Sequence, residues 1–248
     1  MWSTYPVGTR KAAGTGIAVF MSDRGTAVVT SAHVLETARQ GPVFIAVRMA
    51  GTEGGTRTAI VGYYPPRAGG SYYVRHPRHD VAAFALPLPE GPVSMNTCLD
   101  YKGIGNQPLH AGDQVFFAGY PDVMPYLKGV FPVLRKGTIA TYPVGTPEMN
   151  DMFCIDAGVY PGDSGSPVFT ASGGSRRPRL AGMILKRVTR DPHDNSNIAV
   201  AVSAGAIRET LDMLAAKAPS NAGESRGASG RPAAGYRAVS PPRSTPDR

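Results

Sequence analysis

The chain has 248 residues, of which 42% are hydrophobic and 18% are charged, and this balance excludes a globally disordered protein. Thirty Gly and 23 Pro residues favour a fold of many short strands and tight turns over a helical fold. The net charge of +8 indicates a basic, solvated surface. The chain has two cysteines, Cys98 and Cys154, which are too few for a small disulfide-held scaffold. We therefore expect both to be buried free thiols.

The N-terminal residues show no targeting segment. They lack a basic stretch followed by a long apolar run, and the apolar residues 16–21 are too few for a signal-peptide core or a membrane span. We therefore expect a cytoplasmic protein without a membrane span. A secreted mature form whose leader has been removed is the alternative.

Short runs of Val, Ile, Ala and aromatic residues, separated by Gly or Pro, predict two groups of strands. The first group is predicted at residues 16–20, 26–30, 43–48, 58–63, 72–75 and 81–86. After a connector rich in Pro and Gly, the second group is predicted at residues 114–119, 133–140, 152–156, 167–170, 179–187 and 198–202. Two sets of six runs predict two packed β-barrels or sandwiches, and the spacing alone does not choose between them.

One helix is predicted at residues 203–217, with Ser203 as its N-cap. Its apolar face is formed by Ile207, Leu211 and Leu214. The following residues, 218–248, form a tail rich in Arg, Pro, Gly and Ser, which has too little apolar surface to fold and is predicted to be disordered. Nucleic-acid binding through the tail arginines is a further hypothesis, but a solvated basic tail is the simpler interpretation.

Residues 162–167 read Gly-Asp-Ser-Gly-Ser-Pro and provide a candidate nucleophile, Ser164. Glycines on both sides allow a tight bend that exposes the hydroxyl. Such a bend can also aim the amides of Gly162 and Ser164 at one point, where they would stabilise an oxyanion. A plain Gly-rich hairpin turn is the structural alternative.

A serine hydroxyl becomes a good nucleophile only beside a base that is itself oriented by a third group. His33 closes a predicted strand in the context Thr-Ser-Ala-His-Val, and Asp80 opens the apolar run Asp-Val-Ala-Ala-Phe-Ala-Leu. A carboxylate at the start of so apolar a strand is partly buried and needs a partner. Taken singly, His33 is better explained as a strand-end histidine with a structural role, whereas a structural turn aspartate and a functional acid explain Asp80 equally well.

Together these three segments, in the order His, Asp, Ser, resemble the chymotrypsin-like (trypsin-like) serine peptidase family over roughly residues 12–217. The Gly-x-Ser-Gly-Ser-Pro-Val form is similar to the bacterial glutamyl endopeptidase and HtrA-type branch. The resemblance implies an all-β domain at residues 1–217, with two six-stranded antiparallel β-barrels at about 12–90 and 112–202 and a C-terminal helix.

The resemblance also implies a serine endopeptidase that acts on polypeptides. Ser164 would form the acyl-enzyme, His33 would act as the base, Asp80 would orient the histidine, and the amides of Gly162 and Ser164 would form the oxyanion hole. No cofactor is implied. A catalytically silent relative that serves as a binding module is the alternative function.

By the same resemblance, Gly158 would lie at the base of the specificity pocket, where members that select Lys or Arg carry an acid. The strand at residues 182–187, with Leu185, Lys186 and Arg187, would pair with the substrate backbone and wall the pocket. We expect an apolar P1 residue, and an acidic one is the alternative because of the two cations.

Two further features lie near the predicted triad. No Ile-Val-Gly-Gly activation signal precedes the first strand, so we expect no zymogen switch, and Asp163 would need another partner or solvent. Residues 76–80 read His-Pro-Arg-His-Asp, which are residue types of a metal site. The proline and the following strand oppose the helix that this spacing would suit, so we expect no metal there.

Overall fold

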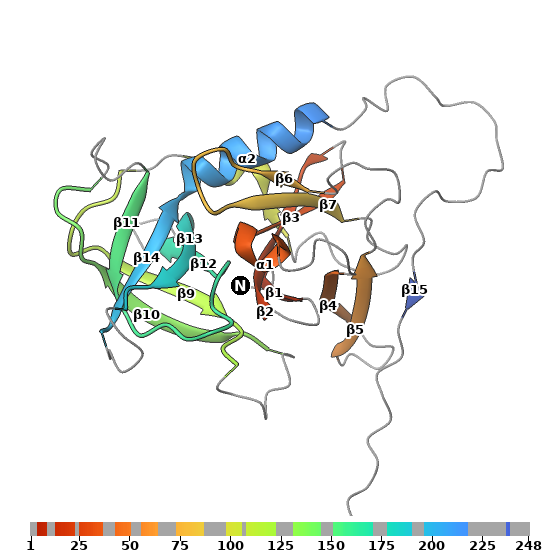
Figure 1. Ribbon diagram of the computed structural model, residues 1–248, viewed down its shortest axis with the longest axis horizontal. Coiled ribbons are helices and arrows are strands. Elements are labelled where there is room, and N and C mark those ends of the chain that lie inside the picture. Colours follow the sequence, from red (N-terminus) through yellow and green to blue (C-terminus); the bar gives the residue numbers. More distant parts are fainter. Residues whose placement is uncertain are drawn as a thin grey trace, which may run out of the picture.

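Strands from the first half of the chain form one sheet, strands from the second half form another, and helix α2 lies across both (Figure 1). The structure is a computed structural model, and it describes residues 4–8, 13–22, 25–36, 43–50, 56–63, 73–86, 98–105, 108–122, 131–144, 151–170, 178–189, 196–217 and 237–238. Most of the tail that we predicted to be disordered, residues 218–236 and 239–248, lies outside the described residues.

The second half of the chain closes into an antiparallel barrel of six strands, as predicted. Its strands are β9 (Gln114–Gly119), β10 (Val133–Ile139), β11 (Met152–Asp156), β12 (Pro167–Thr170), β13 (Arg179–Arg187) and β14 (Ile198–Ser203). Their order around the barrel is β10-β11-β14-β13-β12-β9. Buried side chains such as Phe117, Phe153 and Ile155 fill the interior, because alternate residues of a strand point to the same face.

The described strands of the first half, joined by β15 from the C-terminal tail, form a half-barrel where we predicted a six-stranded barrel. Its strands are β1 (Thr4–Gly8), β2 (Ala13–Phe20), β3 (Thr26–Thr30), β4 (Val43–Ala50), β5 (Thr56–Tyr63), β6 (Val74–Arg75), β7 (Ala82–Leu86), β8 (Leu99–Asp100) and β15 (Arg237–Ala238). They follow the order β15-β5-β4-β1-β2-β3-β7-β6, and β8 pairs with β2 in parallel. The path does not close within the described residues because β6 has two residues and pairs with β7, while the outer edge of β5 receives β15.

Three strands of this sheet were not predicted. Strand β1 is a five-residue segment that contains Pro6, and a proline in so short a segment is typical of a turn. In the structure, β1 nevertheless pairs with both β2 and β4. Strands β8 and β15 have two residues each, too few for a period-2 pattern. Strand β15 also means that two residues of the predicted tail are paired with β5.

Helix α2 (Ala204–Lys217) begins one residue after its predicted start and ends where it was predicted to end. Ser203 is the N-cap, and its Oγ accepts the N–H of Ala206 at 3.4 Å. Ile207 and Leu211 are fully buried. In Figure 1 the helix runs along the top of the molecule, where it contacts β13 and β14 of the barrel and β3, β6 and β7 of the half-barrel.

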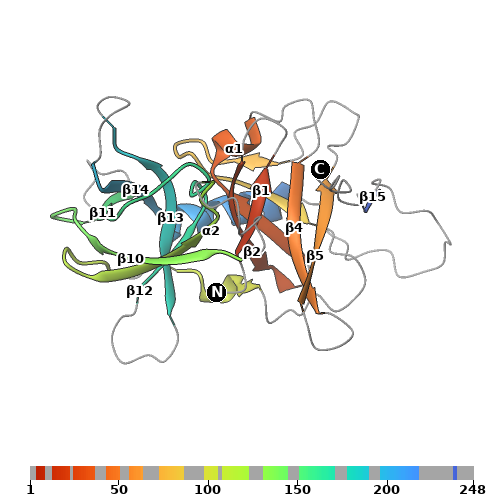
Figure 2. The same cartoon turned by 90° about the horizontal axis from the view of Figure 1, so that it is seen from below.

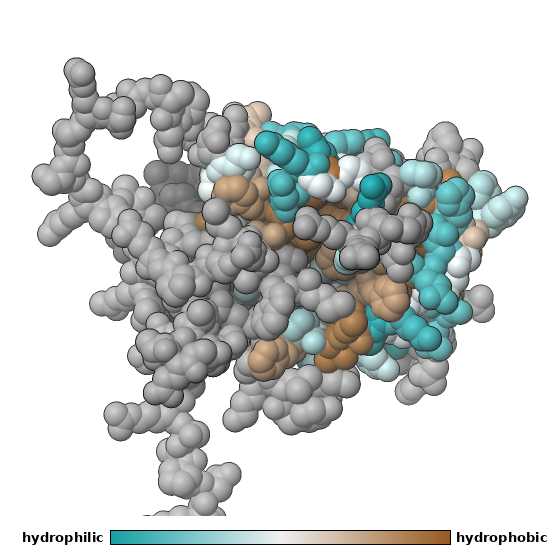
Figure 3. Space-filling model, turned by 180° about the vertical axis from the view of Figure 1, so that it is seen from behind, coloured by the Kyte–Doolittle hydropathy of each residue, from teal (hydrophilic) through white to brown (hydrophobic). Residues whose placement is uncertain are grey.

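Two short helical turns complete the described structure: α1 (Ala32–Glu36) and the 3-10 helix η3 (Tyr101–Gly103). No helix in the described part of the chain is long and apolar enough to cross a membrane. On the face opposite to Figure 1, hydrophilic residues cover much of the described surface of the second half (Figure 3).

The two halves share one apolar core where they lie side by side (Figure 2). This core combines buried residues of the half-barrel, the barrel and α2, among them Ile17, Val29, Met183, Val202 and Ile207. Because both sheets bury side chains here, the segments at this junction are held firmly relative to one another.

Cys98 and Cys154 form no disulfide, as predicted, but they are half-buried rather than buried. Cys154 lies on β11 between Phe153 and Ile155, both of which point into the barrel. Its own side chain therefore points to the other face of the strand.

Candidate active site

The predicted base and acid form a close pair. His33 lies in α1, whereas we predicted the end of a strand, because β3 stops before it and a single helical turn follows. Its Nδ1 atom lies 2.6 Å from Oδ2 of Asp80, and its backbone N–H donates to Oδ1 of the same carboxylate at 2.9 Å. Both carboxylate oxygens of Asp80 therefore contact His33, which fixes the orientation of the imidazole ring.

The same carboxylate changes the protonation of His33. The hydrogen bond to Asp80 raises the pKa of His33 above its ordinary value of 6.5, against the opposing effect of burial, and the charges of Asp80 and Glu36 act in the same direction as the hydrogen bond. The His33 side chain is 49% exposed, so solvent screens part of this effect. Because a histidine must be neutral to accept a proton, His33 can act as a base only above this raised pKa.

Ser164 lies in a tight turn that depends on glycine. Gly162 and Gly165 have φ angles of +93° and +92°, a region that other residues rarely adopt. The N–H of Asp163 donates to the carbonyl of Tyr160 at 3.0 Å across the turn. A Cβ atom on Gly165 would lie 1.8 Å from a carbonyl oxygen of β2, so the backbone approaches the half-barrel as closely as glycine permits.

This turn packs against the segments that surround His33. The carbonyl of Ser164 accepts the N–H of Thr15 on β2 at 2.7 Å. A Cβ atom on the neighbouring Gly14 would lie 2.9 Å from the same carbonyl and 2.7 Å from the side chain of Val34. The fold thus brings the turn of the predicted nucleophile next to the helix that carries the predicted base.

Some of the hydrogen-bond donors in the Ser164 turn have an acceptor, and others have none within the described residues. The hydroxyl of Ser164 donates to the carbonyl of Leu185 on β13 at 3.0 Å. The amides of Asp163 and Gly165 donate to carbonyl oxygens at 3.0 and 2.8 Å. In contrast, the amides of Gly162 and Ser164 donate to no acceptor within the described residues, so these two N–H groups are available to an oxyanion.

Asp163, immediately before Ser164, is 1% exposed and is paired with Arg135 of β10. Oδ1 of Asp163 accepts a hydrogen bond from Nη2 of Arg135, and Oδ2 accepts the N–H of Tyr160 at 2.7 Å. The Nη1 of Arg135 donates to the carbonyl of Gly158 at 3.2 Å. One arginine therefore binds the carbonyl of Gly158 and the side chain of Asp163, at the two ends of the segment that leads to Ser164.

The sequence did not identify this arginine. A buried carboxylate requires a cation, which is why we expected Asp163 to need a partner or solvent. However, Arg135 and Lys136 are adjacent on β10 and point to opposite faces of the strand. Only the strand register shows that Arg135 faces Asp163.

A pocket of about 220 Å³ lies beside Ser164. Its lining includes the apolar Val159, Pro161 and Ile184. Of the four residues predicted to bind substrate, Lys186 and Arg187 line it, whereas Gly158 and Leu185 do not. Gly158 precedes the lining segment, and Leu185 contributes its carbonyl to the Ser164 hydroxyl.

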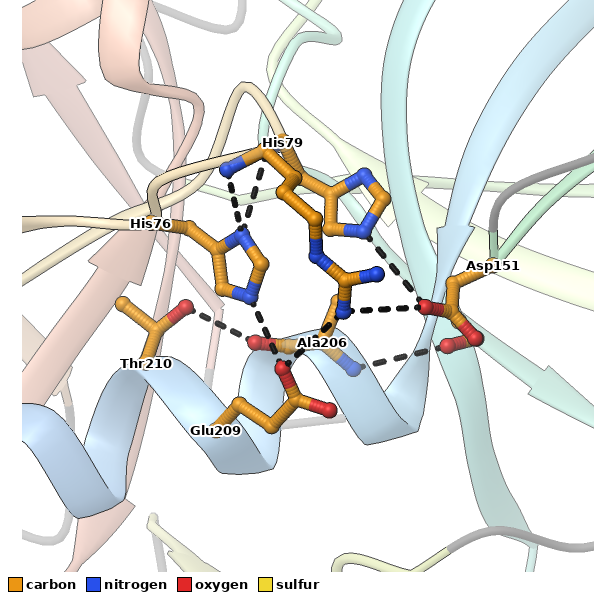
Figure 4. A network of polar contacts seen from close by, with 8 residues as sticks. His76, His79, Asp151, Ala206, Glu209 and Thr210 are labelled. Atoms are coloured by element: carbon orange, nitrogen blue, oxygen red, sulfur yellow. Dashed lines mark hydrogen bonds and ion pairs between the residues drawn. The ribbon is translucent and has the colours of Figure 1, made fainter.

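No three His, Cys, Asp or Glu side chains are grouped as metal ligands in the residues that the structure describes. The two histidines of residues 76–80 instead face carboxylates of the second half of the chain. These contacts form the network of Figure 4.

Comparison with known proteins identifies the family. The model of the trypsin-like peptidase domain matches residues 14–175, more than half of the chain. No curated protein sequence matches it. Among solved structures, Deg5 has a TM-score of 0.59 at 15% identity and covers 86% of this chain and 88% of its own. A thermostable serine protease, AL20, from an extremophilic microorganism has a TM-score of 0.57 at 17% identity, with 87% of this chain and 96% of its own covered. A Glu endopeptidase in complex with MPD has a TM-score of 0.55 at 16% identity, with 87% and 91% covered.

Structural similarity at such low identity supports the fold, and the family match supports the enzyme class. The fold itself, a closed β-barrel beside a half-barrel with one C-terminal helix, is that of the chymotrypsin-like proteases. The chain belongs to the trypsin-like peptidase family and is a serine-type endopeptidase.

Proposed function

We propose that this endopeptidase cleaves peptide bonds through an acyl-enzyme on Ser164, with His33 as the general base and Asp80 as its orienting acid. The observation that carries the proposal is the double contact of Asp80 with His33, at 2.6 and 2.9 Å, beside the Ser164 turn. Because Asp80 accepts the proton on Nδ1, the Nε2 atom of His33 is the basic nitrogen.

In the first half of the reaction, Nε2 of His33 takes the hydroxyl proton while Oγ of Ser164 attacks the carbonyl carbon of the substrate. The amides of Gly162 and Ser164 donate to the oxyanion of the tetrahedral intermediate. The imidazolium, stabilised by Asp80, then gives its proton to the leaving amine. Water repeats the sequence on the acyl-enzyme, which releases the acid and restores the hydroxyl.

The contact between Ser164 and Leu185 suggests how the substrate backbone binds. The serine hydroxyl must leave the Leu185 carbonyl, where it lies 3.0 Å away, before it can be deprotonated by His33. The freed carbonyl can then accept an N–H from an extended substrate. Such pairing would use the end of β13 that lies beyond its last partner on β12, the Pro167–Met183 pair, and would hold the scissile bond over the turn.

The charges around the pocket point to substrates without a basic P1 residue. Lys186 and Arg187 line the pocket, and the acidic residue in the lining, Asp163, is already paired with Arg135. A Lys or Arg side chain would meet like charges there, whereas an acidic or apolar side chain would not. Digestion of a peptide library, followed by mass spectrometry of the products, measures this preference directly.

The mechanism is tested by a fluorophosphonate probe together with turnover of a peptide substrate. The wild-type chain should be labelled on Ser164 and should cleave the substrate, while Ser164→Ala should do neither and should keep the wild-type melting temperature. Cleavage by the Ser164→Ala variant would refute the assignment. A folded wild-type chain that neither reacts nor cleaves but binds peptides would support the binding module instead.

A further inference from the structure

The loop that carries Asp80 is organised around a buried histidine. His76 follows β6, is 1% exposed, and its Nδ1 accepts the backbone N–H groups of Arg78 at 3.2 Å and of His79 at 3.1 Å (Figure 4). A nitrogen that accepts two hydrogen bonds carries no proton, so the ring proton lies on Nε2. That Nε2 lies 3.0 Å from Oε2 of Glu209 on α2 and donates to it.

Two further contacts link this loop to the second half of the chain. Nη2 of Arg78 lies 3.6 Å from carboxylate oxygens of both Glu209 and Asp151. Nε2 of His79 lies 3.5 Å from Asp151, too long to be a strong hydrogen bond. Burial lowers the pKa of His79 and so favours its neutral form.

Besides the contacts of Asp80 with His33, backbone hydrogen bonds also hold the loop. The backbone N–H of His76 donates to the carbonyl of Val81 at 2.8 Å, and the carbonyl of Asp80 accepts the N–H of Ala32 at 3.2 Å. Strand β6 before the loop has two residues. The hydrogen bond to Glu209 therefore ties the inner turn of the loop to a helix that is itself packed on both halves.

We propose that Glu209, acting through His76, is a positioning residue that holds the Asp80 loop in the geometry needed to orient His33; this rests on the proposed function. Glu209 touches neither the substrate nor the reacting atoms. Its effect is transmitted along the backbone of five consecutive residues, from His76 to Asp80. Helix α2 is thus part of the catalytic framework as well as of the core.

A purely structural role predicts something different. If the contact between His76 and Glu209 served only to dock α2, its loss would lower the melting temperature and leave the folded enzyme unchanged. If it positions Asp80, its loss also weakens the hydrogen bond that raises the pKa of His33. The acid limb of the profile of kcat/KM against pH would then move to lower pH, because His33 would stay neutral at lower pH.

The test compares Glu209→Ala, Glu209→Gln and the control Asp212→Ala in the full chain. Asp212 lies on the same helix but contacts Tyr101, away from the loop. In Glu209→Ala we expect kcat to fall about ten- to a hundredfold, since small misplacements of catalytic groups have effects of this size, with little change in KM. Glu209→Gln keeps an oxygen acceptor for His76 and should recover most of kcat, and Asp212→Ala should resemble the wild type.

The outcomes separate this inference from the proposed mechanism. If Glu209→Ala keeps both the wild-type kcat and the wild-type acid limb while Asp80→Asn is impaired, the positioning role is wrong and the mechanism stands. If Asp80→Asn is also fully active, the proposed mechanism itself fails. Glu209 is 55% exposed, so the alanine variant should fold. A glutamine variant as slow as the alanine variant would overturn the role of the hydrogen bond.

Discussion

The ion pair beneath the nucleophile turn gives the sharpest prediction. Asp163 is 1% exposed and the side chain of Arg135 is 18% exposed, so Arg135→Met leaves a carboxylate without its cation in the interior. Removing one partner of a buried pair costs about 3–5 kcal/mol. For a domain of this size that cost lowers the melting temperature by roughly 6–20 °C.

The same change should slow catalysis. Arg135 also holds the carbonyl of Gly158 at 3.2 Å, so its loss releases the backbone on which the Gly162 amide is carried. We expect kcat to fall about a hundred- to a thousandfold, the effect of losing one oxyanion-hole donor. Thermal unfolding followed by circular dichroism and steady-state kinetics on a peptide substrate measure both effects.

Two control variants change a neighbouring residue on β10 and the other partner of the Arg135–Asp163 ion pair. Lys136→Met removes an exposed positive charge next to Arg135 and should leave both kcat and the melting temperature nearly unchanged. The double variant Arg135→Met with Asp163→Asn removes both charges and should be more stable than Arg135→Met alone. If Arg135→Met matches Lys136→Met in both measurements, the bracing role inferred for Arg135 is wrong.

Three other changes test other parts of the site. Asp80→Asn should lower kcat by about 10⁴-fold. In the profile of kcat/KM against pH, the acid limb of the remaining activity should move to lower pH, because the variant loses the hydrogen bond that raises the pKa of His33. Gly165→Ala should lose activity and melt well below Gly103→Ala, because its Cβ would lie 1.8 Å from a backbone oxygen whereas nothing lies within 4 Å of the Gly103 position. Arg187→Gln should reduce cleavage after acidic residues relative to apolar ones by about tenfold, scored by peptide-library digestion.

The sequence predicted the barrel of the second half well because its strands are marked locally. Strands β9, β11, β12 and β13 have the predicted bounds, since each is an apolar run bordered by Gly, Pro or polar residues. The half-barrel was predicted less well. Strands β1 and β8 owe their pairing to partners elsewhere in the chain, and neither has an alternating pattern of its own.

The sequence likewise identified some residues of the candidate site and missed others. The Ser164 turn could be recognised from its glycines, because a tight bend at positive φ demands that residue. Arg135 and Glu209 could not, because their partners lie 28 and 133 positions away and no local pattern records the pairing. Residues that touch the reaction carry short motifs, whereas residues that hold them in place are visible only in three dimensions.

The partner of Asp163 also bears on how the enzyme becomes active. We expected no zymogen switch from the absence of an activation signal in the sequence. In the structure, Oδ1 of Asp163 is occupied by Arg135 and Oδ2 by the N–H of Tyr160. Arg135 lies on β10 of the closed barrel, and Tyr160 lies in the segment between β11 and β12 that also carries Ser164. A newly cut amino terminus would have to compete with Arg135 for this carboxylate. Under the proposed function, we therefore expect the Ser164 turn to take its geometry from the folding of the barrel, while the half-barrel and α2 hold His33 and Asp80 beside it.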